Sequence, residues 1–251
     1  MELCHNLFLQ GAIAKRCTAE EKWVELANEC NAIFSVEYKL EDYIRVVNAH
    51  LSFLSLEIRK NVSETNFHTY LALVNLRGDA LTKKASSYNS KELELFEIAL
   101  QSIINSSTGS VSSIELLNKA ASEKNWLKKE ASKSLDKFVE DLWLEDFEFK
   151  LYMGSFSIAP RTFMELQLYL QNSFHNLESC ALCRDVCIKG NFCSSPSCKV
   201  KAHDFCSHPR CVSCGATWPW PVVGEPLLYK KGSFAEVFPE DRVRRVRVKE
   251  E

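Results

Sequence analysis

The spacing of apolar residues in the first third of the chain changes from a helical period to a strand period. One helical face is predicted at residues 40–54, with apolar positions at Leu40, Tyr43, Val47, Leu51 and Leu54. From residue 56 to 59 apolar and charged residues alternate, and after a polar turn at 63–66 a second apolar run covers 70–76. A period of two on both sides of a polar turn predicts a β-hairpin.

Two helical candidates precede this pattern. The first covers residues 6–17, and the second begins at Thr18, where Thr18 and Glu21 have the spacing of a capping box. Three helices followed by a hairpin are the plan of a winged-helix domain, which we place at residues 1–88.

The second third of the chain repeats this order of elements without detectable sequence identity to the first. Ser90 is placed to cap a helix, a longer helix is expected at 127–142, and loose alternation at 143–153 predicts a second hairpin. Pro160 then favours the start of another helix. We therefore expect a second winged-helix domain at 89–176, and a mainly α fold with small β wings.

The last third is dominated by cysteine. Eight cysteines and two histidines fall within thirty-five residues, and eight of these ten side chains form four pairs of potential metal ligands: Cys180 and Cys183, Cys193 and Cys198, His203 and Cys206, and Cys211 and Cys214. Eight such ligands are the number that two tetrahedral zinc ions need. The segment has too few apolar residues to bury a core of its own. We therefore expect two Zn²⁺ ions to hold a small domain at residues 177–220.

Four pairs allow two arrangements around two ions. In the sequential arrangement, neighbouring pairs share an ion. In the interleaved cross-brace, one ion is held by Cys180, Cys183, His203 and Cys206, and the other by Cys193, Cys198, Cys211 and Cys214. We favour the cross-brace, because the four-residue loop between Cys206 and Cys211 can carry the chain between two sites but hardly close two adjacent ones.

Both arrangements describe structural metal sites. A zinc ion with four protein ligands has no open position for water or substrate, so no catalytic residue is expected there. Thiolate ligands also need a compartment that keeps cysteines reduced. Cys187 and His208 are spare donors in this region, and either would serve as a ligand if the register around Cys193 and Cys198 were different.

Charge and hydropathy limit the possible binding to nucleic acid and to membranes. A net charge of −2 gives no general attraction for nucleic acid, so DNA contact depends on local features. One such feature is a stripe of Lys129, Lys133 and Lys137 on a predicted helix, although acidic residues share that helix and solvated lysines are the commoner outcome. No apolar run is long enough for a membrane span. The segment at 221–251, which ends in RVRRVRVKEE, is expected to be extended and disordered.

Several stretches, in order, resemble the non-SMC element 1 family, the RING-like subunit of the DNA-repair SMC complex of the Smc five–six type. They are LEDYI, LEIRKNVSE and ALVNL, then ELELFEIALQSIINSSTGSVSS and KKEASKSLDKFVEDLWL, then CALC, HDFC and CVSCGATWPW. The resemblance covers about residues 40–220. Two features depart from the family: four residues separate Cys193 from Cys198, and the loop from Cys206 to Cys211 is short.

The resemblance implies tandem winged-helix domains followed by a C-terminal variant RING, in a nuclear, chromosome-associated protein of DNA repair and recombination. It also implies a MAGE-type partner bound through the winged-helix domains, a kleisin-type subunit, and SMC heads reached through the complex. Candidates for the MAGE-type interface are Tyr43, Val47, Phe53 and Leu54, and an internal core is the alternative for these residues. The variant RING implies ubiquitin ligase activity, weak without the partner.

Several interpretations of the function stay open. A RING-type E3 ubiquitin ligase works by positioning a charged ubiquitin-conjugating enzyme, and its contact candidates here are Leu182, Val212 and Trp218. A non-catalytic zinc-braced interaction scaffold and a DNA-binding subunit are the alternatives. A PHD finger is disfavoured, because Pro209 stands where such fingers usually have an aromatic residue.

Overall fold

The computed structural model describes residues 1–76, 88–147, 154–175, 177–206 and 210–217. The chain forms two compact units. The first unit comprises residues 1–63 and 68–173, and the second comprises 64–67 and 174–251. The four-residue hairpin tip at 64–67 therefore belongs to the second unit, whereas the strands on either side of it belong to the first.

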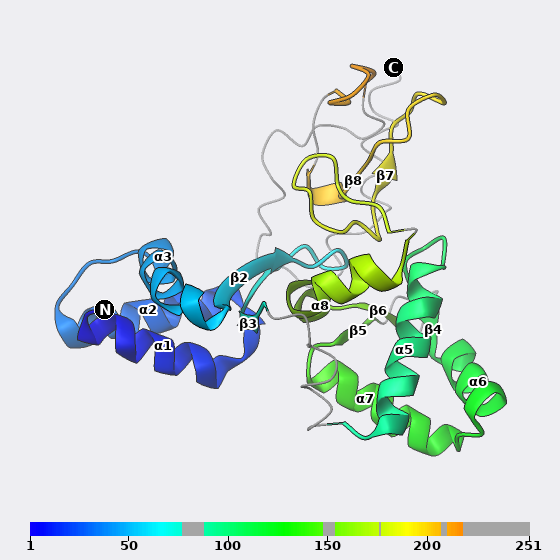
Figure 1. Ribbon diagram of the computed structural model, residues 1–251, viewed down its shortest axis with the longest axis horizontal. Coiled ribbons are helices and arrows are strands. Elements are labelled where there is room, and N and C mark those ends of the chain that lie inside the picture. The colour runs from blue at the N-terminus through cyan, green and yellow to red at the C-terminus, as the bar shows by residue number, and fades with distance from the viewer. Residues whose placement is uncertain (77–87, 148–153, 176, 207–209, 218–251) are drawn as a thin grey trace. The chain divides into compact units, whose positions relative to one another are not determined.

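The N-terminal part of the first unit contains helices and one three-stranded sheet (Figure 1). Its elements in order are α1 (Leu3–Lys15), β1 (Cys17–Ala19), α2 (Glu20–Phe34), α3 (Leu40–Leu51), the 3-10 helix η1 (Ser52–Leu54), β2 (Leu56–Val62) and β3 (Thr69–Asn75). The sheet order is β1-β3-β2, with antiparallel neighbours. The predicted helix at 40–54 and the predicted hairpin are present, and the short strand β1 is an addition between the first two helices.

A buried cluster joins these helices to the sheet. The apolar face of α3 is buried, and it packs against Phe8 and Trp23, which have no exposed surface. The rings of Phe8 and Tyr43 stack with centroids 4.7 Å apart. Tyr43 and Val47 are therefore core residues rather than partner contacts. They lie on the apolar face of α3, and this face packs against the protein's own core. Phe53 and Leu54, by contrast, are exposed.

Two predicted helix caps are wrong. Thr18 does not open a capping box, because it lies in β1, and the N-cap of α2 is Ala19, which makes no side-chain cap. Ser90 is the first helical residue of α5 rather than its cap. The cap is Asn89, whose side-chain oxygen accepts a hydrogen bond from the Glu92 backbone N–H at 2.9 Å.

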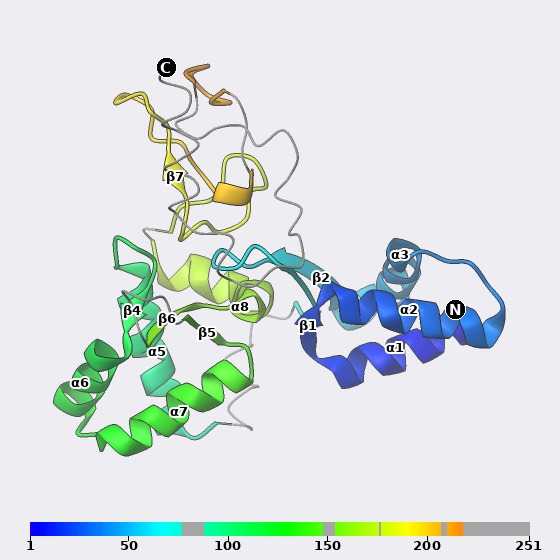
Figure 2. The same cartoon turned by 180° about the vertical axis from the view of Figure 1, so that it is seen from behind.

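The C-terminal part of the first unit repeats the architecture (Figure 2). Its elements are α5 (Ser90–Ile104), β4 (Val111–Ser112), α6 (Ser113–Lys124), α7 (Lys128–Glu140), β5 (Leu144–Phe147), β6 (Ser155–Ile158) and α8 (Pro160–Ser173). The sheet order is β4-β6-β5. In both sheets an early short strand pairs with the second strand of a later hairpin. Helix α8 begins at Pro160 as predicted, and residues 148–153 of the predicted second hairpin lie outside the described residues.

The helices of the first unit are amphipathic, and their buried faces carry the core. On α7, Phe138 is 1% exposed and packs against the rings of Tyr88 and Phe96. Trp126 and Trp143, at apolar positions of the pattern, are also buried. Among the described residues, no helix combines the length and the apolar character that crossing a bilayer requires.

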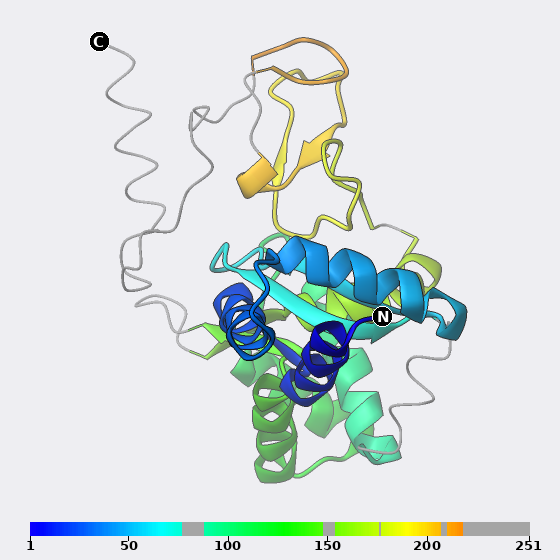
Figure 3. The same cartoon turned by 90° about the vertical axis from the view of Figure 1, so that its left-hand side faces the viewer.

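The second unit has little regular structure (Figure 3). Its elements are β7 (Asn191–Phe192), β8 (Lys201–Ala202) and the 3-10 helix η2 (Asp204–Cys206), with β7 and β8 paired antiparallel. Its buried cluster consists of Ala202 and four cysteines: Cys180, Cys187, Cys193 and Cys211. Cysteine side chains therefore make up most of the interior, with few aliphatic ones. The segment 221–251 lies outside the described residues.

Candidate metal centre

The eight predicted ligands of the second unit gather in two groups of four. In the first group, the potential ligand atoms of Cys180, Cys183, His203 and Cys206 all lie within 4.8 Å of one another. The second group has the same property and consists of Cys193, Cys198, Cys211 and Cys214. The groups take alternate pairs along the chain, which is the interleaved arrangement.

One pair in each group, with two residues between its cysteines, lies in the same kind of backbone turn. In the first group, the Arg184 N–H donates to the Cys180 carbonyl at 2.9 Å. In the second, the Gly215 N–H donates to the Cys211 carbonyl at 2.9 Å. Arg184 and Gly215 both have a φ of 71°, in the left-handed region that glycine tolerates best. The Leu182 N–H also points at the Cys180 sulfur at 3.4 Å. Such N–H donors favour the thiolate form that binds metal.

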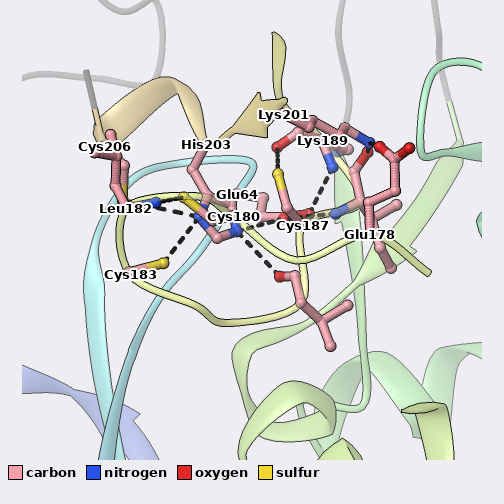
Figure 4. A network of polar contacts seen from close by, with 12 residues as sticks. Glu64, Glu178, Cys180, Leu182, Cys183, Cys187, Lys189, Lys201, His203 and Cys206 are labelled. Atoms are coloured by element: carbon pink, nitrogen blue, oxygen red, sulfur yellow. Dashed lines mark hydrogen bonds and ion pairs between the residues drawn. The ribbon is translucent and has the colours of Figure 1, made fainter. Parts of the chain in front are cut away.

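In the first group, the imidazole of His203 presents Nδ1 to the sulfur atoms (Figure 4). This nitrogen lies 3.3 Å from Cys183 Sγ and 3.8 Å from Cys206 Sγ. The other ring nitrogen, Nε2, lies 3.0 Å from the Val186 carbonyl oxygen. The ring is 3% exposed, so both nitrogens need partners within the protein. Nδ1 is therefore the atom available to a metal ion.

In the second group, four sulfur atoms face one another. Cys193 Sγ lies 3.5 Å from Cys214 Sγ, and Cys198 Sγ lies 3.7 Å from Cys211 Sγ. Disulfide sulfurs lie about 2.05 Å apart. Two thiolates on one tetrahedral zinc ion, with Zn–S bonds of about 2.3 Å, lie about 3.8 Å apart. The separations therefore rule out disulfides and fit sulfurs that share an ion.

The pKa values of two thiols are lowered, one in each group. The pKa of Cys183 falls to about 3, first because the Cys206 thiol hydrogen bonds to its sulfur and further because of His203. The pKa of Cys211 falls to about 6, first because of the backbone N–H of Cys214. In each group, neighbouring donors therefore favour the thiolate form of one cysteine, which is the form that binds metal.

The donor sets fit zinc. Three thiolates with one imidazole, and four thiolates, are the donor sets of structural zinc sites. Thiolate and imidazole donors also discriminate against magnesium and calcium, which prefer oxygen. With four protein donors in each group, such an ion keeps no position for a substrate. The groups can therefore bind metal and brace the fold.

The spare donor Cys187 is a member of neither group of four. Its side chain is 1% exposed, and its thiol donates a hydrogen bond to the Lys189 carbonyl oxygen at 3.5 Å. Burial raises the pKa of this thiol, against the effect of hydrogen bonding to His203. Cys187, His203 and Glu64 form a separate cluster on the Nε2 side of the imidazole. His208 lies outside the described residues.

The predicted contact residues have different environments. Leu182 is half-buried against the cysteine cluster, whereas Val212 is 55% exposed. Trp218 lies outside the described residues. On α7, Lys129 and Lys133 are exposed, but the Lys137 ammonium lies 3.1 Å from Glu92 Oε1 and 4.2 Å from the centre of the Tyr88 ring. The structure therefore does not present the three lysines as one free stripe.

Three residues of interest were not found from the sequence. Glu64 and Phe205 contact His203, but nothing in the local pattern marks a turn glutamate or a phenylalanine as a neighbour of a ligand. His5 is 4% exposed, because α1 turns it toward Tyr38 and Tyr43. For Glu64, only its burial in the folded structure distinguishes it from a solvated turn residue.

The fold and the two ligand groups define a mainly helical protein with small sheets and a cysteine-rich C-terminal module that can bind metal. Residues 5–166 match the family described as the Nse1 non-SMC component of the SMC5-6 complex. This chain belongs to the Nse1 family.

Relatives in animals and yeast extend the similarity to most of the chain. The non-structural maintenance of chromosomes element 1 homolog of Bos taurus is 34% identical over 235 residues, covering 87% of this chain and 85% of the relative. The Homo sapiens homolog is also 34% identical, over 232 residues, with the same coverage of both chains. The Schizosaccharomyces pombe protein is 24% identical over 222 residues, covering 85% of this chain and 91% of the relative.

A solved structure has the same fold. A chain of the structure described as the Nse1-Nse3-Nse4 complex matches with a TM-score of 0.72 and 31% sequence identity. The match covers 88% of this chain and 99% of that chain.

Proposed function

We propose that the protein is an Nse1-type subunit of an SMC5-6 complex and acts in DNA repair and recombination in the nucleus. Its partners are an Nse3-type subunit of the MAGE class and an Nse4-type subunit of the kleisin class, through which it reaches the SMC heads. Family membership supports this assignment, as does the match to nearly the whole of a chain in the Nse1-Nse3-Nse4 complex.

The C-terminal module is a two-zinc cross-brace of the RING type. The observation that carries this proposal is the alternation of the two ligand groups along the chain. Cys180, Cys183, His203 and Cys206 hold one zinc ion, and Cys193, Cys198, Cys211 and Cys214 hold the other. Native mass spectrometry of the full chain tests it, with two tightly held zinc ions expected. Fewer than two equivalents of zinc would reject the assignment.

The two parts of the first unit act as winged-helix domains, and the N-terminal one contacts the MAGE-class partner. The matching order of strands in the two sheets supports the common domain type. Phe53 is 75% exposed and Leu54 is 46% exposed, next to each other in η1. Adjacent large apolar side chains at the surface are typical of a binding site.

Replacement of both apolar side chains of η1 tests the partner contact. In the full chain, Phe53→Glu combined with Leu54→Glu is expected to weaken binding of the MAGE-class subunit by about tenfold or more, as loss of an interface anchor does. Ile114→Glu is the matched control, because Ile114 is 70% exposed on α6. Equal affinity for the double variant and the wild type would place the interface elsewhere.

The module is also the ubiquitin ligase part of the protein. A RING-type ligase holds a conjugating enzyme so that its thioester reacts, and this needs an exposed apolar surface beside the zinc sites. Val212, between the last two ligands, and Phe192, next to the second pair, are both at least half exposed. They are the contacts we assign to the conjugating enzyme.

Discharge of ubiquitin from a charged conjugating enzyme tests the ligase proposal. The full chain with its MAGE-class partner is expected to accelerate discharge, and Val212→Arg is expected to abolish that acceleration without changing zinc content. Ile33→Arg is the control, since Ile33 is 64% exposed in the first unit. Absence of discharge with a broad panel of conjugating enzymes would overturn the proposal.

A non-catalytic zinc-braced scaffold is the second candidate. The observation in its favour is the half-burial of Leu182 against the cysteine cluster, which removes one expected contact from the surface. On this alternative the zinc ions are retained and the partners bind, but no ubiquitin is discharged. The same assay therefore separates the two functions.

A weak DNA contact through α7 is limited to two lysines. Lys129 and Lys133 are exposed, whereas Lys137 is held by Glu92. Each phosphate neutralised adds about 0.9 to the slope of log affinity against log salt. A slope of no more than about 2 is therefore expected from this helix, and a slope unchanged by reversing the charge of Lys129 and Lys133 would exclude it.

A further inference from the structure

Glu64 is a buried carboxylate at the hairpin tip of residues 64–67. It is 8% exposed, and ionised carboxylates are seldom buried unless they are paired or hydrogen bonded. Its Oε1 accepts a hydrogen bond from the Ile188 backbone N–H at 2.9 Å, and its Oε2 accepts one from the Lys189 N–H at 2.9 Å. Its Oε1 also lies 3.1 Å from His203 Nε2. A residue from the first third of the chain thus enters the cysteine-rich module.

The orientation of the His203 ring gives the carboxylate a chemical role. Nδ1 faces the Cys183 and Cys206 sulfurs, so Nε2–H points away from the ligand group. One acceptor in front of this N–H is the Val186 carbonyl. The other is the Glu64 carboxylate, which lies beside His203 in Figure 4. In metal sites, the ring nitrogen of a histidine that does not bind the ion commonly donates to such a group. The hydrogen bond fixes the tautomer and makes the metal-binding nitrogen more basic.

Other residues of the hairpin tip also contact the module. The Lys189 ammonium donates a hydrogen bond to Thr65 Oγ1 at 2.9 Å. The Phe67 and Phe205 rings make a T-shaped contact, with centroids 6.3 Å apart. The Phe205 ring in turn stacks on the His203 ring, with centroids 4.6 Å apart and an angle of 11° between the ring planes. The imidazole is therefore fixed at its edge by a carboxylate and on its face by an aromatic pair.

We propose that Glu64 is an outer-shell positioning residue of the first metal site, so that the hairpin tip is an integral part of the metal-binding module. The carboxylate orients His203 as a ligand through Nδ1, and it also holds the Ile188–Lys189 backbone between the first and second ligand pairs. This inference rests on the proposed two-zinc module.

The effect of Glu64 is specific to one of the two sites. Within the described residues, its hydrogen bonds go to His203 and to the Ile188 and Lys189 amides, and none goes to a cysteine of the second group. The second site consists of cysteines alone, so it has no imidazole to orient. The second zinc ion therefore serves as an internal reference for the first.

The test is zinc release from the full chain carrying Glu64→Gln. Glutamine keeps the size of the side chain but has a single acceptor oxygen, and its amide N–H₂ faces a backbone N–H donor. Glu178→Gln is the matched control in the same unit, because the Glu178 carboxylate is 44% exposed and lies 4.0 Å from the Lys201 ammonium. Native mass spectrometry counts the ions, a chromogenic chelator follows their release, and absorption of the cobalt-substituted protein distinguishes the three-cysteine, one-histidine site from the four-cysteine site.

Loss of an outer-shell partner typically weakens metal affinity about 10- to 100-fold. We therefore expect Glu64→Gln to lower the affinity of the histidine-containing site by about this factor, with the four-cysteine site unchanged and Glu178→Gln equal to wild type. Equal affinity of the first site in the variant and the wild type would overturn the inference, even if the Ile188 and Lys189 amides exchange faster. Equal loss from both sites would also overturn it, as general unfolding. A wild-type chain that holds fewer than two zinc ions would instead reject the proposed module itself.

Discussion

Removal of metal from the full chain is expected to unfold the second unit and leave the first unit folded. The interior of the second unit is made of Ala202 and four cysteines, with Val186 among the few buried aliphatic side chains beside them. Burial of one such side chain contributes about 1.5–3 kcal/mol, whereas a structural zinc ion contributes about 10–16 kcal/mol at neutral pH. The metal therefore supplies most of the favourable free energy of this unit.

The first unit has no such dependence. Its cores contain many fully buried large side chains, among them Trp23, Tyr43, Phe8, Phe138 and Leu71. Each contributes without metal, because its burial removes apolar surface from water.

Hydrogen exchange followed by mass spectrometry, with and without a strong chelator, is the assay. The informative amides of the second unit are those hydrogen bonded within it: Ala181 to Lys201, Cys193 to Val200, and Cys211 to Ala216. Their protection is expected to disappear with metal removal, while the amides of the β2–β3 ladder stay protected. Persistent protection of the first set in metal-free protein, or simultaneous loss of both sets, would refute the reasoning.

Three substitutions test the packing described above, each by chemical denaturation of the full chain. Phe138→Ala is expected to lower the free energy of unfolding of the first unit by about 3–5 kcal/mol, because it leaves a cavity in a buried aromatic cluster. Leu127→Ala is the control, because Leu127 is exposed, and a loss for Phe138→Ala as small as that for Leu127→Ala would contradict this. Glu165→Ala removes the partner that lies 2.6 Å from the half-buried Arg161 guanidinium, and a loss of about 1.5–3 kcal/mol is expected; an unchanged midpoint would count against it. Gly190→Ala places a methyl group 2.4 Å from the Ala202 carbonyl oxygen, so it is expected to destabilise the second unit by about 1–3 kcal/mol, with no change in the first.

The elements predicted well from the sequence are those in which the spacing of apolar residues matches the period of a helix or a strand. The face of α3 with Leu40, Tyr43 and Val47 is buried at the predicted spacing, and the period of two before and after residues 63–66 becomes β2 and β3. The strand β1 was missed, because three residues carry no period and pair only with the distant β3. The predicted N-caps of α2 and α5 were wrong for a related reason, because neighbouring residues compete for the N-cap position.

The candidate ligand residues were recognisable, because paired cysteines at short spacing are a local signal. The structure brings the four side chains of each predicted group together. Glu64 was not recognisable, because more than one hundred residues separate it from His203 and a polar turn predicts only solvent exposure. The same limit applied to Tyr43 and Val47, where the sequence showed an apolar face but not which surface covers it. The environment of such residues depends on long-range packing, which the pattern of a single sequence does not reveal.

The alternation of the ligand groups has a consequence during synthesis on the ribosome. Neither set of four is complete until its last cysteine has emerged, and these are Cys206 and Cys214, only eight positions apart. Five cysteines of the module, from Cys180 to Cys198, therefore emerge before either set can be complete. A stop codon at any position up to 206 would therefore leave both sets incomplete, whereas a stop at 207–214 would leave only the second set incomplete.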